Sequence, residues 1–373
     1  MCKFERAISI LVQDHIVSSS RKIMLNHIIF GLICIFAIIY HCIKSTISFC
    51  KSLLKRECVK NDKNKIIIIT GCDSGFGRML SEKLAKEKEE LQSNHGEFTV
   101  VSLCLSQEAV EDLKKLGIHS IKCDVTSDED VSKAKDSIQT LLGNSSSVLY
   151  ALVNNAGIAD SGYVIFNRDI KPFQKTMDVN FFGQLRVVQA LLPLFLNSSK
   201  EYGGRIINIS SVCGMSVMIG NSSYCASKYA VEAWSDGLRL ELAPFNLKTV
   251  KVRPGCFNTK IQNNWAKIFL SKYQQASKQV QDLFGGKAYE EKLVKFFESD
   301  MFKGAQSPPV GVVNSLIDII FKKHNKLEPY YCVGNDSKTL FKALHCLPTN
   351  VADSVKHSIN FFGAVPCGCS HSG

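Results

Sequence analysis

The chain has 373 residues, of which 45% are hydrophobic and 21% are charged. This composition excludes a disordered or collagen-like polypeptide and suits one large α/β domain with a deep core. The formal net charge is +11, and residues 1–65 alone carry +7, with eleven Lys and Arg against four Asp and Glu. A positive excess concentrated at the N-terminus, beside an apolar segment, argues against a nucleic-acid-binding domain and for contact with anionic lipid.

The 15 cysteines are scattered along the chain without the Cys-x-x-Cys or Cys/His spacing of a zinc site. No metal site is therefore predicted. The odd number and the scatter indicate reduced structural thiols facing a reducing compartment, with a lumenal protein that contains some disulfides as the alternative.

The first predicted element is the apolar segment IMLNHIIFGLICIFAIIYHCI at residues 23–43. As a helix it would be roughly 30 Å long, the thickness of the hydrocarbon core of a bilayer. A basic segment precedes it at 1–22, and a basic linker follows at 44–64. We expect a membrane anchor that contacts lipid through residues 23–43. A cleaved signal peptide is disfavoured, because no small-x-small cleavage site follows the run.

From residue 65 onward, apolar β runs alternate with amphipathic helices. This alternation predicts a doubly wound parallel α/β sheet of the Rossmann type, covered by helices on both faces. Strands are expected at 65–69, 98–103, 120–123, 148–153, 205–209, 249–252 and 330–333, and helices at 79–90, 107–116 and 128–142. The domain is assigned to 65–340, with an inserted helical substrate lid at 260–305. Residues 341–373 are expected to form a C-terminal extension with a loose tail.

The first turn from strand to helix, TGCDSGFG at residues 70–77, is rich in glycine. Gly71 permits a tight turn, Gly75 lets the backbone approach a pyrophosphate, and Gly77 lets the helix pack on the strand. The helix N-terminus would then face phosphates with its N–H groups, so a dinucleotide site is favoured over a turn without a ligand. The loop residues assigned to cofactor binding are Thr70, Gly71, Asp73, Ser74, Gly75, Phe76 and Gly77.

The end of the second strand, at residues 103–106, is where the adenosine ribose of a dinucleotide should lie. No Arg or Lys occurs there to bind a 2′-phosphate, and Ser74 in the glycine loop is neutral. The Asp or Glu that usually binds a free 2′-hydroxyl is missing as well, so NAD is favoured over NADP only by the absence of a cation. Asp124 and Val125, after the third strand, are also assigned to the cofactor. Asp124 can accept from the adenine amino group or cap a turn.

Polar residues follow the fourth and fifth strands. In the Asn-Asn-Ala-Gly turn at 154–157, Asn154 can tie neighbouring strand ends together, while Ala156 and Gly157 form the wall beside the cofactor. The strand at 205–209 leads to Ser210 and Ser211. A serine here can hydrogen-bond a substrate oxygen as charge develops on it.

Tyr224 and Lys228 are spaced i, i+4 and would share one face of a helix. A tyrosine with an ordinary pKa of about 10 is a poor base at pH 7. A nearby ammonium and the nicotinamide charge would stabilise the phenolate and lower that pKa. The pair is therefore a candidate acid/base device.

These motifs resemble those of the short-chain dehydrogenase/reductase superfamily, which they match in order over residues 65–340: TGCDSGFG, NNAG, NISS at 208–211 with YCASK at 224–228, and PGCFNT at 254–259. The resemblance implies that Tyr224 is the acid/base, that Lys228 modulates its pKa and binds the ribose, and that Ser211, rather than Ser210, is the partner of the substrate oxygen. It further implies that Asn180 supports a water relay to Lys228. Contacts to the nicotinamide end are implied for Pro254, Gly255 and Thr259.

The TGCDSGFG version of the loop and the VGNDSK segment at 333–338 are similar to the group of retinol dehydrogenases and 17-beta-hydroxysteroid dehydrogenase type 2. This narrower resemblance implies an NAD-dependent enzyme that oxidises an alcohol, or reduces the ketone or aldehyde, of a lipophilic substrate such as a retinoid or hydroxysteroid. Aromatic residues of the lid could line a slot for that substrate or simply pack its helices: Trp265, Phe269, Tyr273, Phe284, Phe296 and Phe297.

A mitochondrial 3-hydroxybutyrate dehydrogenase is the alternative enzyme, with Lys260 and Lys267 as available cations. A non-enzymatic NAD-binding scaffold is disfavoured, because the set of catalytic residues is complete. The family implies a homodimer or tetramer. The membrane of the endoplasmic reticulum is the expected location, with a mitochondrial membrane as the alternative.

Overall fold

The computed structural model describes residues 31, 35–46, 63–143, 146–167, 169–197, 199–299 and 307–358. The chain divides into two compact units, Met1–Cys58 and Val59–Gly373. In the first unit, residues 35–46 form a helix with exposed side chains. Of the predicted anchor at 23–43, residues 23–30 and 32–34 lie outside the described residues.

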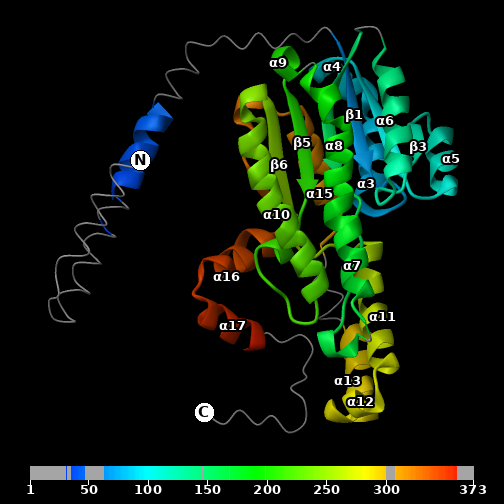
Figure 1. Ribbon diagram of the computed structural model, residues 1–373, viewed down its shortest axis with the longest axis vertical. Helices are drawn as coiled ribbons and strands as arrows, with labels where there is room; N and C mark the ends of the chain where they lie inside the picture. Colours follow the sequence, from blue (N-terminus) through cyan, green and yellow to red (C-terminus); the bar gives the residue numbers. More distant parts are fainter. Residues whose placement is uncertain are drawn as a thin grey trace. The chain divides into compact units, whose positions relative to one another are not determined.

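Seven parallel strands form one sheet in the order β3-β2-β1-β4-β5-β6-β7 (Figure 1). The strands are β1 Asn64–Thr70, β2 Phe98–Cys104, β3 His119–Lys122, β4 Ser147–Asn154, β5 Gly204–Ile209, β6 Leu247–Pro254 and β7 Tyr330–Val333. The predicted strands and the doubly wound fold are confirmed, because each run of apolar residues forms a strand of this sheet. The strand order reverses between β1 and β4, and ligands of such sheets bind outside the carboxyl ends of the strands at that point.

Helices cover both faces of the sheet because successive side chains of each buried strand point to opposite sides. In β1, Ile67 and Ile69 pack against helices α3, α5 and α15, whereas Ile66 and Ile68 pack against α6, α8 and α10. The main helices of this layer structure are α3 Gly75–Lys86, α4 Lys88–His95, α5 Gln107–Lys115, α6 Asp128–Leu142, α7 Lys171–Met177, α8 Gly183–Leu196, α9 Ser199–Tyr202, α10 Ser222–Leu242 and α15 Val310–Phe321.

One helix in the described part of the chain is long and apolar enough to cross a membrane, by length and composition only. It runs over Lys171–Leu196 and combines α7, the π-helical turn η2 (Asp178–Phe182) and α8. Its side chains Val187, Val188 and Leu191 are buried in the core against the sheet. We therefore interpret this helix as part of the globular core.

The inserted lid consists of α11 Lys260–Gln275, α12 Lys278–Leu283 and α13 Gly286–Glu298. Its aromatic residues pack mainly on one another and on Tyr163 and Phe166, for example with ring centroids 5.6 Å apart for Trp265 and Phe269. Most of the lid aromatics therefore pack the lid helices together rather than line a slot for the substrate. An ion pair of 2.5 Å between Lys272 Nζ and Asp160 Oδ1 joins the lid to the loop after β4.

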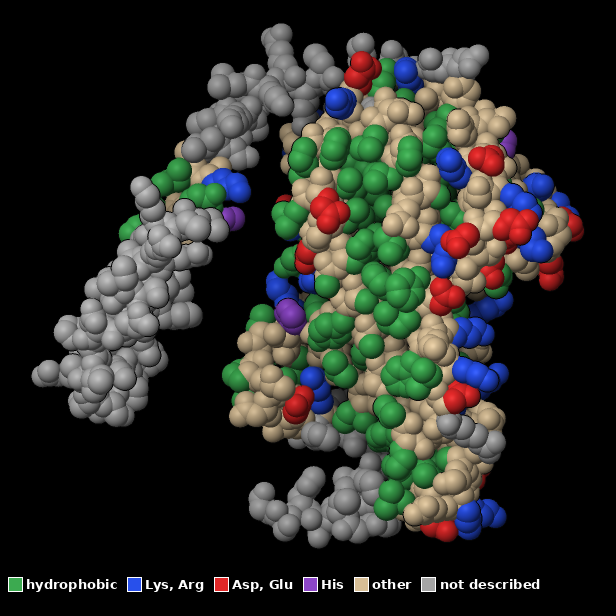
Figure 2. Space-filling model, viewed as in Figure 1, with side chains coloured by type: hydrophobic (Ala, Val, Ile, Leu, Met, Phe, Trp, Pro, Cys, Tyr) green, Lys and Arg blue, Asp and Glu red, His purple; other side chains and the backbone are tan. Residues whose placement is uncertain are grey.

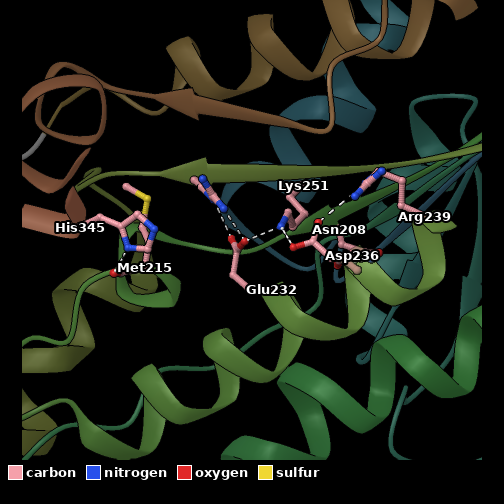
Figure 3. A network of polar contacts seen from close by, with 9 residues as sticks. Asn208, Met215, Glu232, Asp236, Arg239, Lys251 and His345 are labelled. Atoms are coloured by element: carbon pink, nitrogen blue, oxygen red, sulfur yellow. Dashed lines mark hydrogen bonds and ion pairs between the residues drawn. The ribbon is translucent and has the colours of Figure 1, made fainter. Parts of the chain in front are cut away.

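The C-terminal extension also packs on the domain. Helices α16 (Lys342–Cys346) and α17 (Thr349–Ser358) bury Leu344 and Ala352 beside Cys213 and Cys225. The His345 Nδ1 atom lies 2.8 Å from the carbonyl oxygen of Met215. Figure 3 shows the two residues next to each other. Helices α16 and α17 are therefore part of the folded domain that contains the sheet. The predicted loose tail at 359–373 lies outside the described residues.

Hydrophobic side chains gather on the face that carries α8 and α10 (Figure 2). Exposed apolar residues in this part of the chain include Phe182, Leu240 and Phe245. Such a surface is where a protein partner would be sought. The homodimer or tetramer stays a prediction.

Candidate active site

A cavity of about 680 Å³ opens at the carboxyl ends of the central strands. Its walls come from the glycine loop after β1, the turn after β4, the end of β5, helix α10 and the loop after β6. This volume falls in the usual range of small-molecule sites. The sheet thus brings together the segments that hold the predicted cofactor-binding and catalytic residues.

The glycine loop has the backbone geometry that its sequence predicts. Gly71 has φ +69°, and a Cβ atom there would lie only 2.7 Å from the Cα atom of Ala156. A Cβ atom on Gly77 would lie 2.5 Å from the carbonyl oxygen of Gly71. Thr70 Oγ1 accepts hydrogen bonds from the backbone N–H groups of Asn155 (3.0 Å) and Ala156 (2.9 Å). The loop is therefore fixed to the turn after β4.

Asp73 supplies the carboxylate that the sequence at the end of β2 lacks. Its Oδ2 accepts a hydrogen bond from Leu105 N and its Oδ1 accepts one from Ser106 N, both at 2.8 Å. Asp73 and Leu105 both line the cavity. Residues 103–106 hold no acid, as the sequence analysis states, but a carboxylate from another loop lies against this strand end.

Tyr224 and Lys228 lie on one face of α10, as their spacing predicts. Lys228 Nζ is 5.6 Å from the centroid of the Tyr224 ring and donates a hydrogen bond of 2.9 Å to the carbonyl oxygen of Ile209. The side chain of Ser211 lies near Tyr224 and acts to lower its pKa, and both residues line the cavity. Ser210 instead points its Oγ toward Gly214, where an added Cβ would be 2.7 Å away. The structure therefore favours Ser211 over Ser210 as the partner of Tyr224.

Burial sets the protonation of these two groups. Burial raises the pKa of Tyr224 above the ordinary tyrosine value, with Cys213 adding to the rise and the nearby Ser211 side chain opposing it. Burial also lowers the pKa of Lys228 to about 8. Tyr224 is therefore neutral at pH 7, and a further positive charge beside it would be needed to stabilise a phenolate.

Asn180 holds the turn after β4 against α10 from a position in η2. Its Oδ1 accepts from Ile158 N at 2.8 Å, and its Nδ2 donates to Ile158 O at 2.9 Å and to Ser227 Oγ at 3.0 Å. Gly157 lies between Asn180 and Lys228, because its added Cβ would be 3.2 Å from Asn180 Oδ1 and 3.8 Å from Lys228 Nζ. π-Helical turns of this kind often occur at functional sites. The water relay stays a prediction.

A buried ionic network fixes α10 on the sheet, one turn beyond Lys228 (Figure 3). Glu232 accepts hydrogen bonds from Arg253 Nε (2.9 Å) and Nη2 (2.7 Å), and it pairs with Lys251 Nζ at 2.9 Å. Both cations come from β6. Sequence reasoning missed this network, because no local spacing connects residues of a helix with residues of a strand.

Most of the predicted site residues line the cavity: Gly71, Asp73, Ser74, Gly75, Phe76, Asp124, Val125, Ala156, Gly157, Ser211, Tyr224, Lys228, Pro254, Gly255 and Thr259. Four others lie behind its wall and support it: Thr70, Gly77, Asn154 and Asn180. Asn154, for example, donates a hydrogen bond of 2.9 Å to Asn208 Oδ1 and so ties β4 to β5. The binding roles of all these residues stay predictions.

Three residues that no motif indicated also line the cavity: Cys213, Met218 and Asn221. Cys256 of the PGCFNT motif and Trp265 of the lid line it as well, and Trp265 is the lid aromatic for which the slot interpretation holds. Trp265 Nε1 donates a hydrogen bond of 2.7 Å to Asn221 Oδ1, which fixes the indole at this wall. These residues belong to connections whose course depends on tertiary packing. In the part of the chain that the structure describes, no group of three His, Cys, Asp or Glu residues is placed to bind a metal.

We expect the Lys228→Met variant to be more stable than the wild type at pH 7, by roughly 1–3 kcal/mol, while losing activity. The lysine has a pKa of about 8 in the folded protein and 10.5 in the ordinary state, so below pH 8 the fold contains a buried ammonium. The free-energy cost of burying this ammonium disappears as the pH rises from 8 to 10.5. In that range the folded lysine has lost its proton while the unfolded lysine still holds it, so the stability of the wild type rises with pH. Denaturant unfolding at pH 7 and pH 10 measures the difference.

The matched control is Lys175→Met, which removes an exposed lysine at the same cavity. It should show no gain that depends on pH. An equal gain for Lys228→Met at both pH values would contradict the assignment of a buried ammonium.

The family model described as short chain dehydrogenase matches residues 65–268. Retinol dehydrogenase 7 of Rattus norvegicus is 31% identical, over 81% of this chain and 90% of that protein. The 17-beta-hydroxysteroid dehydrogenase type 6 of Bos taurus is also 31% identical, over 81% of this chain and 90% of that protein. The resemblance inferred from the motifs is thereby confirmed.

Solved structures show the same fold. A short-chain dehydrogenase from Streptomyces avermitilis has a TM-score of 0.55 and 24% identity, covering 80% of this chain and 96% of that one. A short-chain dehydrogenase/reductase from Burkholderia phymatum in complex with NAD has a TM-score of 0.57 and 18% identity, covering 79% of this chain and 96% of that one.

Proposed function

We propose, from the premise that this chain belongs to the short-chain dehydrogenase family, that it uses NAD to oxidise a lipophilic alcohol such as a retinoid or hydroxysteroid, or to reduce the corresponding aldehyde or ketone. As a member of this family it is an oxidoreductase that acts on CH–OH groups. The observation that carries the proposal is the meeting of Ser211, Tyr224 and Lys228 in one cavity with the glycine loop.

The residues present fit a dinucleotide. An added Cβ atom on Gly75 would meet no atom within 4 Å, so the first turn of α3 is open to a ligand, and its N–H groups suit a pyrophosphate. Ser74 and Asp124 line the same wall. When bound, the nicotinamide would supply the acceptor for the hydride and a positive charge near Tyr224.

Asp73 supports NAD rather than NADP as the cofactor. Its carboxylate lies at the end of β2, where both of its oxygens accept backbone N–H groups and retain lone pairs for a ribose hydroxyl. A 2′-phosphate at this place would meet a negative charge. The neighbouring cavity residues Ser74 and Leu105 offer no cation to offset it.

The chain's own residues would carry the proton. The Tyr224 phenolate would take the proton of the substrate hydroxyl, and the Lys228 ammonium would stabilise that phenolate. Ser211 would hydrogen-bond the substrate oxygen. Lys228, with Asn180 holding the adjacent turn, would pass the proton toward solvent.

The lipophilic substrate is supported by apolar residues that line the cavity outside the glycine loop: Val212, Met218, Phe257 and Trp265. The names of the relatives, retinol dehydrogenases and a 17-beta-hydroxysteroid dehydrogenase, agree with such a substrate. A 3-hydroxybutyrate dehydrogenase remains the second candidate, because Lys260 lines the cavity and could bind a carboxylate.

The test is NAD reduction, measured at about 340 nm, by the full chain with retinol, androgen and estrogen alcohols, and 3-hydroxybutyrate. The Tyr224→Phe variant serves as the inactive control. Activity on a retinoid or steroid alcohol is the expected result. Activity confined to 3-hydroxybutyrate would overturn the substrate class and leave the reaction type standing.

We further propose that the apolar segment at 23–43 anchors the enzyme in a membrane, with the endoplasmic reticulum as the expected one. The described part of this segment is helical, and its exposed side chains include Ile35, Phe36 and Ile39. Deleting residues 1–45 should move the protein from the membrane pellet to the supernatant, because it removes the apolar segment that is proposed to enter the bilayer. Continued sedimentation of the truncated chain with membranes would place the anchor elsewhere.

A further inference from the structure

The segment that follows β7 lies along the loop that follows β6. Gly255 N donates a hydrogen bond of 2.9 Å to the carbonyl oxygen of Val333, and Ser337 Oγ donates one of 2.8 Å to the carbonyl oxygen of Arg253. Between these contacts, Cys256 N donates to Asp336 Oδ2 at 2.7 Å. Residues from near the end of the described chain therefore set the course of the loop after β6.

The Asp336 carboxylate packs directly on the backbone of Gly255. A Cβ atom added to Gly255 would lie 2.0 Å from Asp336 Oδ1 and 2.3 Å from its Cγ atom. Backbone torsion does not explain this glycine, because positive φ angles occur at other glycines of the chain and not at this one. Gly255 is therefore required by the space that the carboxylate occupies.

Asp336 Oδ1 is buried and has no hydrogen-bond partner among the described residues. A buried carboxylate oxygen without a partner is costly, so its position needs a reason. Asp336 itself does not line the cavity, but Pro254, Gly255 and Cys256 do. The carboxylate thus supports one wall of the cavity from behind.

We propose that Asp336 is a positioning residue for the nicotinamide half of the cofactor, acting through the 254–256 wall. This inference rests on the proposed function, which assigns that wall to the nicotinamide end. The adenosine half would contact different elements, namely the glycine loop and the end of β2 with Asp73. The loss of Asp336 should therefore weaken one half of the cofactor site and spare the other.

The experiment measures binding of NAD and of ADP-ribose, which lacks the nicotinamide, to the full chain in detergent. Tryptophan fluorescence is a suitable signal, because Trp265 lines the cavity. We expect Asp336→Ala to weaken NAD binding at least tenfold and to change ADP-ribose binding less than twofold. Asp336→Asn should stay within about threefold of wild type, because its amide oxygen can still accept from Cys256 N.

The matched control is Asp318→Ala, which removes an exposed carboxylate from α15 and should change neither affinity. A second set of variants tests the contact with Gly255. Gly255→Ala should weaken NAD binding because the new methyl group meets the carboxylate. The double variant Gly255→Ala with Asp336→Gly should bind NAD no more weakly than Asp336→Gly alone, because the obstruction is gone.

Equal weakening of NAD and ADP-ribose binding in Asp336→Ala would overturn the inference and leave a general structural role. Unchanged NAD binding in that variant would overturn it as well, with the proposed function intact. Failure of the wild type to bind NAD at all would overturn the proposed function, and this inference with it. If the Gly255→Ala and Asp336→Gly substitutions weakened NAD binding additively, the contact between the two residues would not be what positions the 254–256 wall.

Discussion

Replacing Tyr224 with phenylalanine should lower the rate of NAD reduction by about a thousandfold or more, while the affinity for NAD changes little. The variant removes only the hydroxyl oxygen that would accept the substrate proton. Lys228 keeps its hydrogen bond to the carbonyl oxygen of Ile209, so the neighbouring wall should remain in place. Steady-state turnover and NAD binding, measured on the same preparation, separate the two effects.

Ser211→Ala is the companion variant, because it removes the hydroxyl group near Tyr224 that is the proposed partner of the substrate oxygen, and keeps the tyrosine itself. We expect a smaller loss of rate, roughly a hundredfold. Cys213 N would also lose its 3.1 Å hydrogen bond to Ser211 Oγ, so thermal stability should be measured alongside. Turnover by Tyr224→Phe at the wild-type rate would refute the role of this residue as acid/base.

Exchanging the charge at the end of β2 should invert the cofactor preference. In the double variant Asp73→Ser with Leu105→Arg, the anion is removed and a guanidinium is placed on the strand end to which Asp73 is hydrogen-bonded. We expect the ratio of kcat/KM for NADP to that for NAD to rise by about a thousandfold. Removing the repulsion between the Asp73 carboxylate and a 2′-phosphate, and adding the attraction of the new guanidinium, should each favour NADP by roughly 2–3 kcal/mol in a partly exposed site. The two cofactors, compared with one alcohol substrate, provide the measurement.

Asp73→Asn is the matched control for charge. It keeps a side chain of the same shape and one oxygen that can accept from Leu105 N or Ser106 N, so the loop should hold its position. Its selectivity should shift only about tenfold. A double variant that retains the wild-type preference for NAD would show that the 2′-position lies elsewhere in the cavity.

The fold could be predicted from the sequence because its signals are local. The Ile66–Ile69 run of β1 is apolar at every position, which only a sheet covered on both faces accommodates. Gly71 has a positive φ angle in the turn after β1, a Cβ atom on Gly77 would meet the carbonyl oxygen of Gly71, and Tyr224 and Lys228 share a helix face by their spacing. Each of these features depends on residues a few positions apart.

The sequence by itself thus determined the parallel sheet, the glycine loop and the shared helix face of Tyr224 and Lys228, while the choice of Ser211 came from the family resemblance. Tertiary structure alone decided the contacts of two carboxylates: Asp73 binds the backbone at the end of β2, and Asp336 packs on Gly255, about 80 positions away in the chain and behind the cavity wall. It also decided that most lid aromatics pack on one another and that Glu232 holds α10 to β6. The physical reason is that these contacts join separate elements, and their partners are fixed by how the layers pack rather than by any local spacing.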